Sequence, residues 1–229
     1  CNSQAGYVLK GVFKGAGDGS AILRMHSKGK LVICDTVKMK RGKFVFEGET
    51  PCVGFALVTV VPEGKESVQM RLALENSKIE MKGDWKNVGM DEEEELVVKG
   101  MTVTGSKNND VNEEIGKQWK VVETLPGFTK YAELAKKVQD NPEILEDTTF
   151  YWVYRKEFDA YMARVKEEQL KIIVANPSVE TAAYQLYFMM NEMPLEQLEQ
   201  IFGLFDEKVG ESELASEVRA CIELRQRIE

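Results

Sequence analysis

The sequence has little of what catalytic and metal sites are made of. Its 229 residues contain one histidine, His26, and four cysteines, none of them in a Cys-x-x-Cys pair. A zinc site needs several Cys, His or carboxylate ligands grouped together, and disulfide exchange needs a second thiol beside the first. Because neither grouping occurs, we expect this chain to carry no metal, no cofactor and no catalysis of its own.

Long apolar runs and basic stripes are also missing. No run of about 18 apolar residues occurs, so no helix is predicted to span a bilayer. Residues 1–105 hold 15 lysines and arginines against 14 acidic residues, whereas residues 106–229 hold 15 against 24. Nucleic acid requires clustered lysine and arginine. We therefore expect no nucleic-acid partner.

The first residue is a cysteine, Cys1, followed by small polar residues. Maturation of bacterial lipoproteins cuts the chain before a cysteine, which is then acylated, and two or more acyl chains hold a protein stably on a membrane. We predict a lipid anchor at Cys1. The protein would then lie in the cell envelope of a Gram-negative bacterium, facing the periplasm or the surface. A chain boundary that falls at a cysteine by chance is the alternative.

The first half alternates apolar and polar side chains with the period of two that is typical of half-buried strands. Phe44 and Phe46, for example, point to one side of their segment and the neighbouring residues to the other. Turn residues separate the segments, and we interpret the glycine-rich turn at 15–19 as a hairpin. Strands are expected over 7–13, 20–26, 31–38, 42–48, 53–61, 67–74, 77–82 and 96–104. These eight strands predict an antiparallel β-sandwich, or a partly closed barrel, over residues 1–105.

After residue 105 the apolar period becomes 3.6, which is typical of helices. Asn141-Pro142 predicts the start of a long helix to about Val174. Residues 181–190 are apolar nearly all round and are expected to form the central buried helix, and further helices are expected over 195–209 and 211–228. The sequence thus predicts an α+β protein, with a β-sandwich domain at 1–105 and an all-α domain at 106–229.

Two sets of side chains bear on function. Cys34 lies in an expected strand, and we interpret it as a small apolar residue of the core, while a bridge to Cys52 remains open in an oxidising compartment. Tyr151, Tyr154 and Phe158 lie at helical spacing and form a stripe. This stripe either packs against another helix or binds a ligand or partner.

The order of several short motifs resembles the domain of unknown function in the N-terminal region of bacterial TlpA-like lipoproteins, whose redox domain has the thioredoxin (AhpC-TSA) fold. These motifs are Asp35-Thr36-Val37, the segment 42–48 with Pro51, Leu74-Glu75-Asn76 and Val103-Thr104-Gly105-Ser106. The helical residues 176–209 resemble the linker bundle of the same proteins. Complete members continue with a thioredoxin-like domain that carries a Cys-x-x-Cys, which these 229 residues do not contain.

The resemblance implies a non-catalytic, lipid-anchored accessory region of a thiol–disulfide oxidoreductase. Such a region would hold a thioredoxin-like domain away from the membrane or receive its client proteins. The alternative is a stand-alone cell-envelope lipoprotein that binds a peptide, glycan or small ligand, through the stripe at Tyr151, Tyr154 and Phe158 or through a groove between the two halves. A free-standing enzyme is disfavoured, because nucleophile, base and metal sets are all missing.

Overall fold

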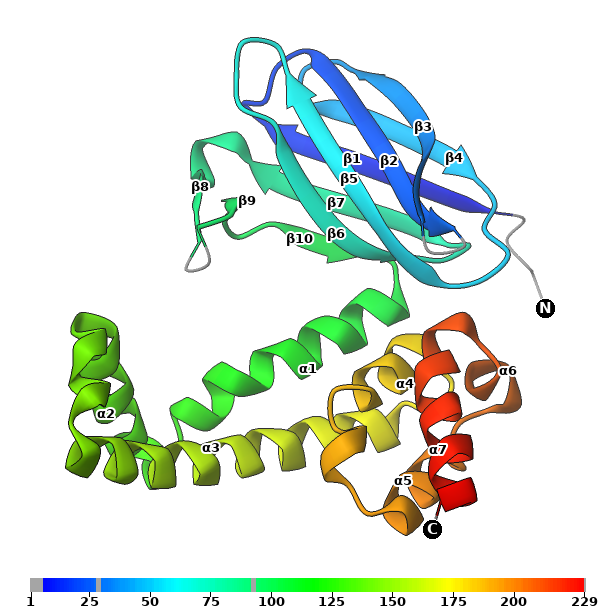
Figure 1. Ribbon diagram of the computed structural model, residues 1–229. Helices are drawn as coiled ribbons and strands as arrows, with labels where there is room; N and C mark the ends of the chain where they lie inside the picture. Colours follow the sequence, from blue (N-terminus) through cyan, green and yellow to red (C-terminus); the bar gives the residue numbers. More distant parts are fainter. Residues whose placement is uncertain (1–5, 28–29, 92–93, 229) are drawn as a thin grey trace.

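Strands form the first half of the chain and helices the second (Figure 1). This computed structural model describes residues 6–27, 30–91 and 94–228. Within these ranges the strands are β1 (Tyr7–Lys14), β2 (Gly19–Ser27), β3 (Lys30–Met39), β4 (Lys43–Gly48), β5 (Gly54–Pro62), β6 (Val68–Leu74), β7 (Lys78–Asp84), β8 (Val88–Met90), β9 (Leu96–Val98) and β10 (Thr102–Thr104). The predicted α+β class is confirmed.

Two four-stranded sheets pack face to face, and the described strands close no barrel. The strand orders are β10-β7-β1-β4 in one sheet and β3-β2-β5-β6 in the other, and β8 and β9 form a separate two-stranded ribbon. Neighbouring strands are antiparallel except β1 and β7, which are parallel. The predicted sandwich is therefore confirmed, with one parallel pair inside it.

The alternating side chains build the core of this sandwich. In β4, Phe44 and Phe46 are buried and the residues beside them are exposed, as predicted. Leu9, Leu23 and Ile79 are likewise buried and come from both sheets. Each large apolar side chain buried in this way contributes about 1.5–3 kcal/mol.

Three local features of the sandwich differ from the prediction. The turn at 15–19 joins β1 to β2, which lie in different sheets, so it is a connection between sheets and not a hairpin. The strand expected over 96–104 is divided into β9 and β10, because the chain turns at Gly100 with a φ of 74°. The strand β8 was not predicted, since three residues are too few to show an alternation.

The helices of the described ranges are α1 (Lys107–Glu123), α2 (Thr129–Asp140), α3 (Thr148–Ala175), α4 (Glu180–Leu186), α5 (Leu195–Phe202), α6 (Glu207–Gly210) and α7 (Ser216–Ile228). Short 3-10 helices are η1 (Trp85–Asn87), η2 (Pro126–Phe128), η3 (Pro142–Glu146), η4 (Met190–Glu192) and η5 (Glu213–Ala215). In this part of the chain, no helix is long and apolar enough to cross a membrane.

The helix boundaries differ from the prediction where a cap or a turn intervenes. Asn141-Pro142 begins only η3, and α3 begins after Asp147, whose carboxylate accepts a hydrogen bond from the N–H of Phe150 at 2.8 Å. The helix expected over 181–190 ends as α4 at Leu186. The helix expected over 211–228 is shorter, because η5 precedes α7.

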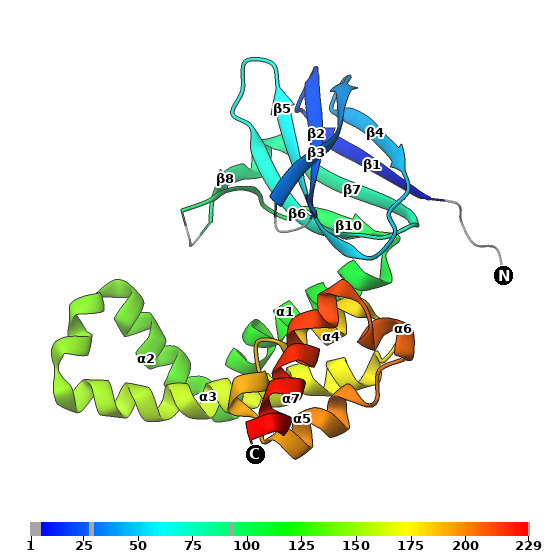
Figure 2. The same ribbon diagram turned by 45° about the vertical axis from the view of Figure 1, so that its right-hand side comes forward.

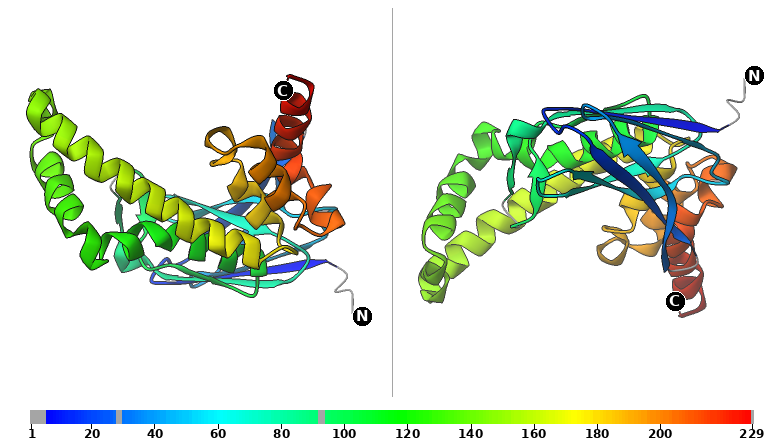
Figure 3. Two further views of the ribbon diagram at one scale, coloured as in Figure 1. Left: turned by 90° about the horizontal axis from the view of Figure 1, so that it is seen from below. Right: turned by 90° about the horizontal axis from the view of Figure 1, so that it is seen from above.

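The long helix α3 connects two helical cores. At one end it packs with α1 and α2 around Val122, Tyr131, Tyr161 and Val165. At the other end it meets the core that α4 to α7 build around residues such as Leu186. Seen from below in Figure 3, α2 and the adjoining end of α3 extend past the sandwich as an arm.

The joint between sandwich and helices is held by local geometry and hydrogen bonds. Gly105 has a φ of 86°, and a Cβ atom there would lie 1.9 Å from the carbonyl oxygen of Lys78, so only glycine fits. Ser106 then caps α1 by accepting from the N–H of Asn109 at 3.1 Å. The Asn109 amide donates to the carbonyl of Ala73 at 2.7 Å and accepts from its N–H at 2.8 Å. Because β6 is an edge strand, this side chain occupies the place of a further strand.

Candidate functional site

The predicted site residues fall into different environments. Cys1, the predicted lipid anchor, lies outside the described residues. Tyr151, Tyr154 and Phe158 all lie on α3, in the arm. The structure therefore places the predicted stripe but describes nothing about the anchor.

Most of the aromatic stripe packs within the arm. The Tyr154 ring lies 6.3 Å from the Tyr131 ring of α2 and 5.9 Å from the Phe158 ring, centroid to centroid. Both side chains are half-buried against the core that contains Tyr131 and Tyr161. Tyr151 lies instead beside Trp152, at 5.3 Å in an edge-on arrangement. Tyr154 thus contributes to packing, whereas Phe158 also reaches the groove described below.

The prediction that Cys34 fills the core is wrong. In the pairing of β2 with β3, Arg24 lies opposite Ile33 and Leu23 lies opposite Asp35, which leaves Cys34 as the extra residue of a bulge. A bulge re-aims side chains and breaks the alternation of a strand. Cys34 and Ile33 are consequently both exposed, on an edge strand, and the structure forms no disulfide between Cys34 and Cys52.

Cys52 lies in the loop between β4 and β5, and its thiol donates to the Glu213 carboxylate with an Sγ to Oε2 distance of 3.7 Å. Burial raises the pKa of this thiol, and the negative charges of Glu213 and Glu180 raise it further. A nucleophilic cysteine needs the opposite, a lowered pKa that populates the thiolate at neutral pH.

We expect Glu213→Gln to speed alkylation of Cys52 a few-fold at neutral pH. Removing the carboxylate lowers the thiol pKa, and more of the reactive thiolate is then present. The rate is measured with iodoacetamide and site-resolved mass spectrometry, with Glu217→Gln on the neighbouring helix as the control. Equal rates in the Glu213→Gln variant and the wild type would contradict this account of the Cys52 environment.

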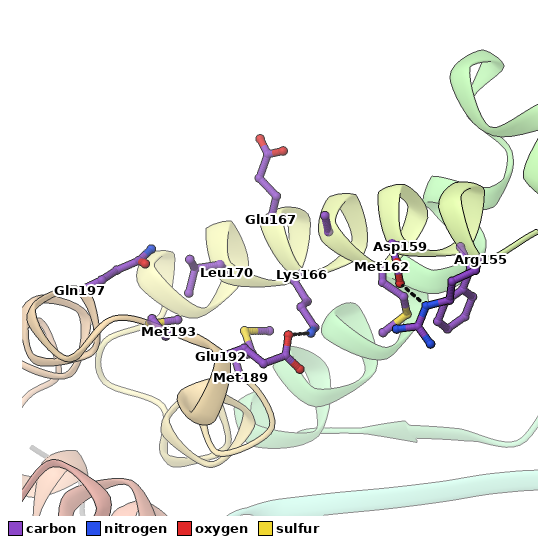
Figure 4. Close-up of a pocket in the computed structure, with 12 residues that line it drawn as sticks. Arg155, Asp159, Met162, Lys166, Glu167, Leu170, Met189, Glu192, Met193 and Gln197 are labelled. Atoms are coloured by element: carbon purple, nitrogen blue, oxygen red, sulfur yellow. Dashed lines mark hydrogen bonds and ion pairs between the residues drawn. The ribbon is translucent and has the colours of Figure 1, made fainter. Parts of the chain in front are cut away.

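A groove of about 700 Å³ runs along one face of α3. We call it the α3 groove, and Figure 4 shows its walls. It is lined from α3 by Arg155, Phe158, Asp159, Met162, Ala163, Lys166, Glu167 and Leu170, and from the opposite side by Met189, Glu192, Met193 and Gln197. The α3 residues recur every three or four positions, so they share one face of the helix.

The two walls of the α3 groove are held by separate contacts. Lys166 of α3 forms an ion pair with Glu192 across the groove, as Figure 4 shows. Arg225 of α7 supports the second wall by donating to the carbonyl oxygens of Met190 and Met193, at 3.3 and 2.8 Å. The wall therefore depends on packing between α7 and the segment around η4.

The α3 groove offers apolar contacts and paired charges. Phe158, Leu170 and the methionines supply ring, aliphatic and thioether surface, and Arg155 pairs with Asp159 at 2.9 Å. Across residues 6–27, 30–91 and 94–228, no three His, Cys, Asp or Glu side chains are grouped to hold a metal ion. The described lining of the groove thus combines apolar surface with ion pairs.

The sequence prediction missed most of the α3 groove. Phe158 was identified as part of a stripe, and Met162 and Leu170 continue the same helical spacing, which could have been read as one apolar face. Met189 was predicted to lie in the central buried helix over 181–190, and Met193 lay between two expected helices. No local pattern brings them to α3, because only the fold of α4 to α7 places them there.

Comparison with known proteins gives one match. Residues 7–112 match the family described as a domain of unknown function, DUF4369. The matched region contains the sandwich and the start of α1, including Asn108 and Asn109 at the joint. No curated protein and no solved structure matches the chain. The match to a domain of unknown function agrees with part of the resemblance, while its link to TlpA-like, thioredoxin-fold lipoproteins stays a prediction.

Proposed function

We propose that this chain is a non-catalytic binding module that holds an amphipathic peptide segment of a partner protein in the α3 groove. The observation that carries the proposal is the lining of the groove, in which Met162, Met189 and Met193 lie with Phe158 and Leu170 between paired charges. Unbranched, polarisable methionine side chains adapt to different partners, and they are common on surfaces that bind peptides.

Size and charge support a peptide as the occupant. A volume of about 700 Å³ is within the usual range for ligand pockets, about 300–1,000 Å³. Residues 106–229 carry 15 basic against 24 acidic residues, so their field favours a segment with basic residues beside its apolar ones. We therefore propose an amphipathic, basic segment as the ligand of the α3 groove.

Selection from a displayed library of random peptides is the first test. We expect the recovered peptides to pair apolar residues with lysine or arginine and to bind the chain in calorimetry. Met162→Asp should weaken them about tenfold or more, because it places a charge among apolar contacts. Met90→Asp, an equally polar change at a residue that is 60% exposed on β8, is the matched control and should have no effect.

A second variant tests whether any loss of binding in Met162→Asp is caused by misfolding. The Glu192 side chain is 68% exposed, so losing its surface ion pair in Glu192→Lys should lower the melting temperature by no more than about 2–4 °C. It should still weaken the basic peptides, since it removes a negative charge and sets a second lysine opposite Lys166. Peptides that bind all three variants and the wild type equally would overturn the proposal.

For the partner itself, we propose a thioredoxin-like redox domain of a periplasm-facing thiol–disulfide oxidoreductase, or one of its client proteins. This step is supported by the sequence resemblance alone, whereas the lipid anchor at Cys1 is also supported by the cysteine itself and the small polar residues after it. The alternative, a stand-alone envelope lipoprotein, would use the same groove for a different peptide. The intact mass of the native protein, extracted from its membranes with detergent, reports both the acyl groups and any additional domain.

A further inference from the structure

A second cavity, of about 470 Å³, lies where the sandwich meets the helices. Figure 2 shows the elements that surround it, with the start of α1 and the helices α4 and α6 below the sandwich. It is lined by Thr50, Pro51, Cys52, Val53, Glu75, Asn76, Lys107, Asn108, Ser178, Val179, Glu180, Lys208 and Ser212. We call it the joint cavity. It is separate from the α3 groove and shares none of its lining residues.

Two carboxylates in the joint cavity share a single amide group. Glu75, which follows β6, and Glu180, at the start of α4, both accept from Nδ2 of Asn108, at 2.8 and 3.3 Å. The Oδ1 atom of Asn108 accepts from the N–H of Thr181 at 2.9 Å, so the whole side chain is engaged. The protein thus supplies one neutral donor group for two negative charges.

Among the described residues, the other oxygen of each carboxylate, Oε1, has no close hydrogen-bond donor or positive charge. Oε1 of Glu75 is buried and has no hydrogen-bond partner. Glu180 is only 6% exposed, and its Oε1 is met by the ammonium of Lys208 at 3.7 Å, which is beyond hydrogen-bond distance. The Lys208 side chain is itself 89% exposed and so contributes little. A carboxylate removed from water normally requires a close partner of opposite charge.

The acidic side chains of the joint cavity are more buried than its basic ones. Its inner end holds Glu75, which is half-buried, and Glu180, which is buried. Its two lysines, Lys107 and Lys208, are both exposed and lie at the mouth. A cation that reaches the inner end would meet two carboxylates for which the protein provides one shared amide donor and one exposed lysine.

We propose that the joint cavity binds a protonated primary amine, with the ammonium group at the carboxylates of Glu75 and Glu180. An ammonium has three donors and no acceptor, which matches a site made of carboxylate oxygens. The volume of about 470 Å³ also admits the rest of a small ligand, such as the amino end of a short peptide or a free amino acid. The lysines at the mouth then face its carbonyl or carboxylate oxygens.

The test uses two amines and a neutral control. Glycinamide presents the amine of a peptide terminus, Nα-acetyl-lysine methylamide presents that of a lysine side chain, and acetylglycinamide has no amine. Binding is followed through the side-chain amide signals of Asn108 in nitrogen-15 NMR spectra, because Asn108 donates to both carboxylates. We expect saturable shifts with one or both amines and none with acetylglycinamide, and the stronger amine identifies the source of the ligand.

Two variants distinguish a specific amine site from non-specific electrostatic attraction. Glu75→Gln should weaken the amine about tenfold, because it removes a charged acceptor, whereas Glu63→Gln on the exposed turn after β5 should not. Lys208→Ala should strengthen binding about threefold, because it removes the competing ammonium, and the 89% exposure of this side chain predicts a small cost in stability. The proposal is overturned if neither amine gives a saturable shift in the wild type and the Lys208→Ala variant, or if Glu75→Gln binds as the wild type does.

Discussion

Asn109→Ala is expected to lower the free energy of unfolding by roughly 2–4 kcal/mol. Its side-chain amide is the partner of both the N–H and the carbonyl of Ala73, at 2.8 and 2.7 Å, and Ala73 is only 1% exposed. Alanine would leave a buried donor and a buried acceptor unsatisfied, and each such group costs about 1–3 kcal/mol. Urea unfolding followed by circular dichroism measures the loss.

Two companion variants make this prediction specific. Asn191→Ala changes an exposed asparagine and should alter stability by less than about 0.5 kcal/mol. Asn109→Asp keeps the acceptor for the N–H of Ala73 but loses the donor to its carbonyl, so it too should destabilise. If Asn109→Ala costs no more than Asn191→Ala, the amide is not what holds the edge of β6 to the helices.

Tyr161→Ala is expected to have a comparable or larger effect, about 3–5 kcal/mol, on the arm formed by α2 and α3. Tyr161 is 4% exposed, and its ring is stacked on that of Tyr131 with the centroids 4.1 Å apart. Its hydroxyl donates to the carbonyl of Trp119 at 2.8 Å, so one side chain joins α1, α2 and α3. Truncation would remove one of the two buried aromatic rings of this small core.

The measurement for Tyr161 must resolve the arm from the rest of the molecule. Hydrogen exchange of the α2 amides reports opening of the arm directly, and thermal melting reports the whole chain. Tyr161→Phe keeps the ring and loses only the hydrogen bond to Trp119, so it should cost about 1 kcal/mol. Unchanged exchange of α2 in Tyr161→Ala would show that the stacked rings do not stabilise the arm.

Local patterns in the sequence were enough to predict most elements of the fold. The alternation around Phe44 and Phe46 predicted a strand and its buried face, and the change to a period of 3.6 after Gly105 predicted where helices begin. Errors occurred where one residue altered a local pattern. The bulge at Cys34 exposes a cysteine that the alternation placed in the core, and the cap at Asp147 delays a helix that Asn141-Pro142 had suggested.

The candidate sites were much less predictable than the elements. The α3 groove needs Met162 beside Met189 and Met193, and the joint cavity needs Glu75 and Glu180 on either side of Asn108. These residues are far apart in the chain, and nothing in the neighbourhood of any one of them indicates its partner. The one functional pattern identified beforehand was the stripe at Tyr151, Tyr154 and Phe158. In the structure Tyr154 and Phe158 pack on the core of the arm, Phe158 also lines the α3 groove, and Tyr151 is half-buried beside Trp152.

The sequence by itself therefore determined the class of the fold, the position of most strands, the change from strands to helices, and the buried face of β4. These depend on interactions between residues a few positions apart, which repeat with a fixed period. Only the tertiary structure decided the parallel pairing of β1 with β7, the attachment of Asn109 to β6, and the two cavities. Each of these features requires residues far apart in the chain to come together and their side chains to pack in one particular way. A local periodic pattern contains no information about such long-range contacts.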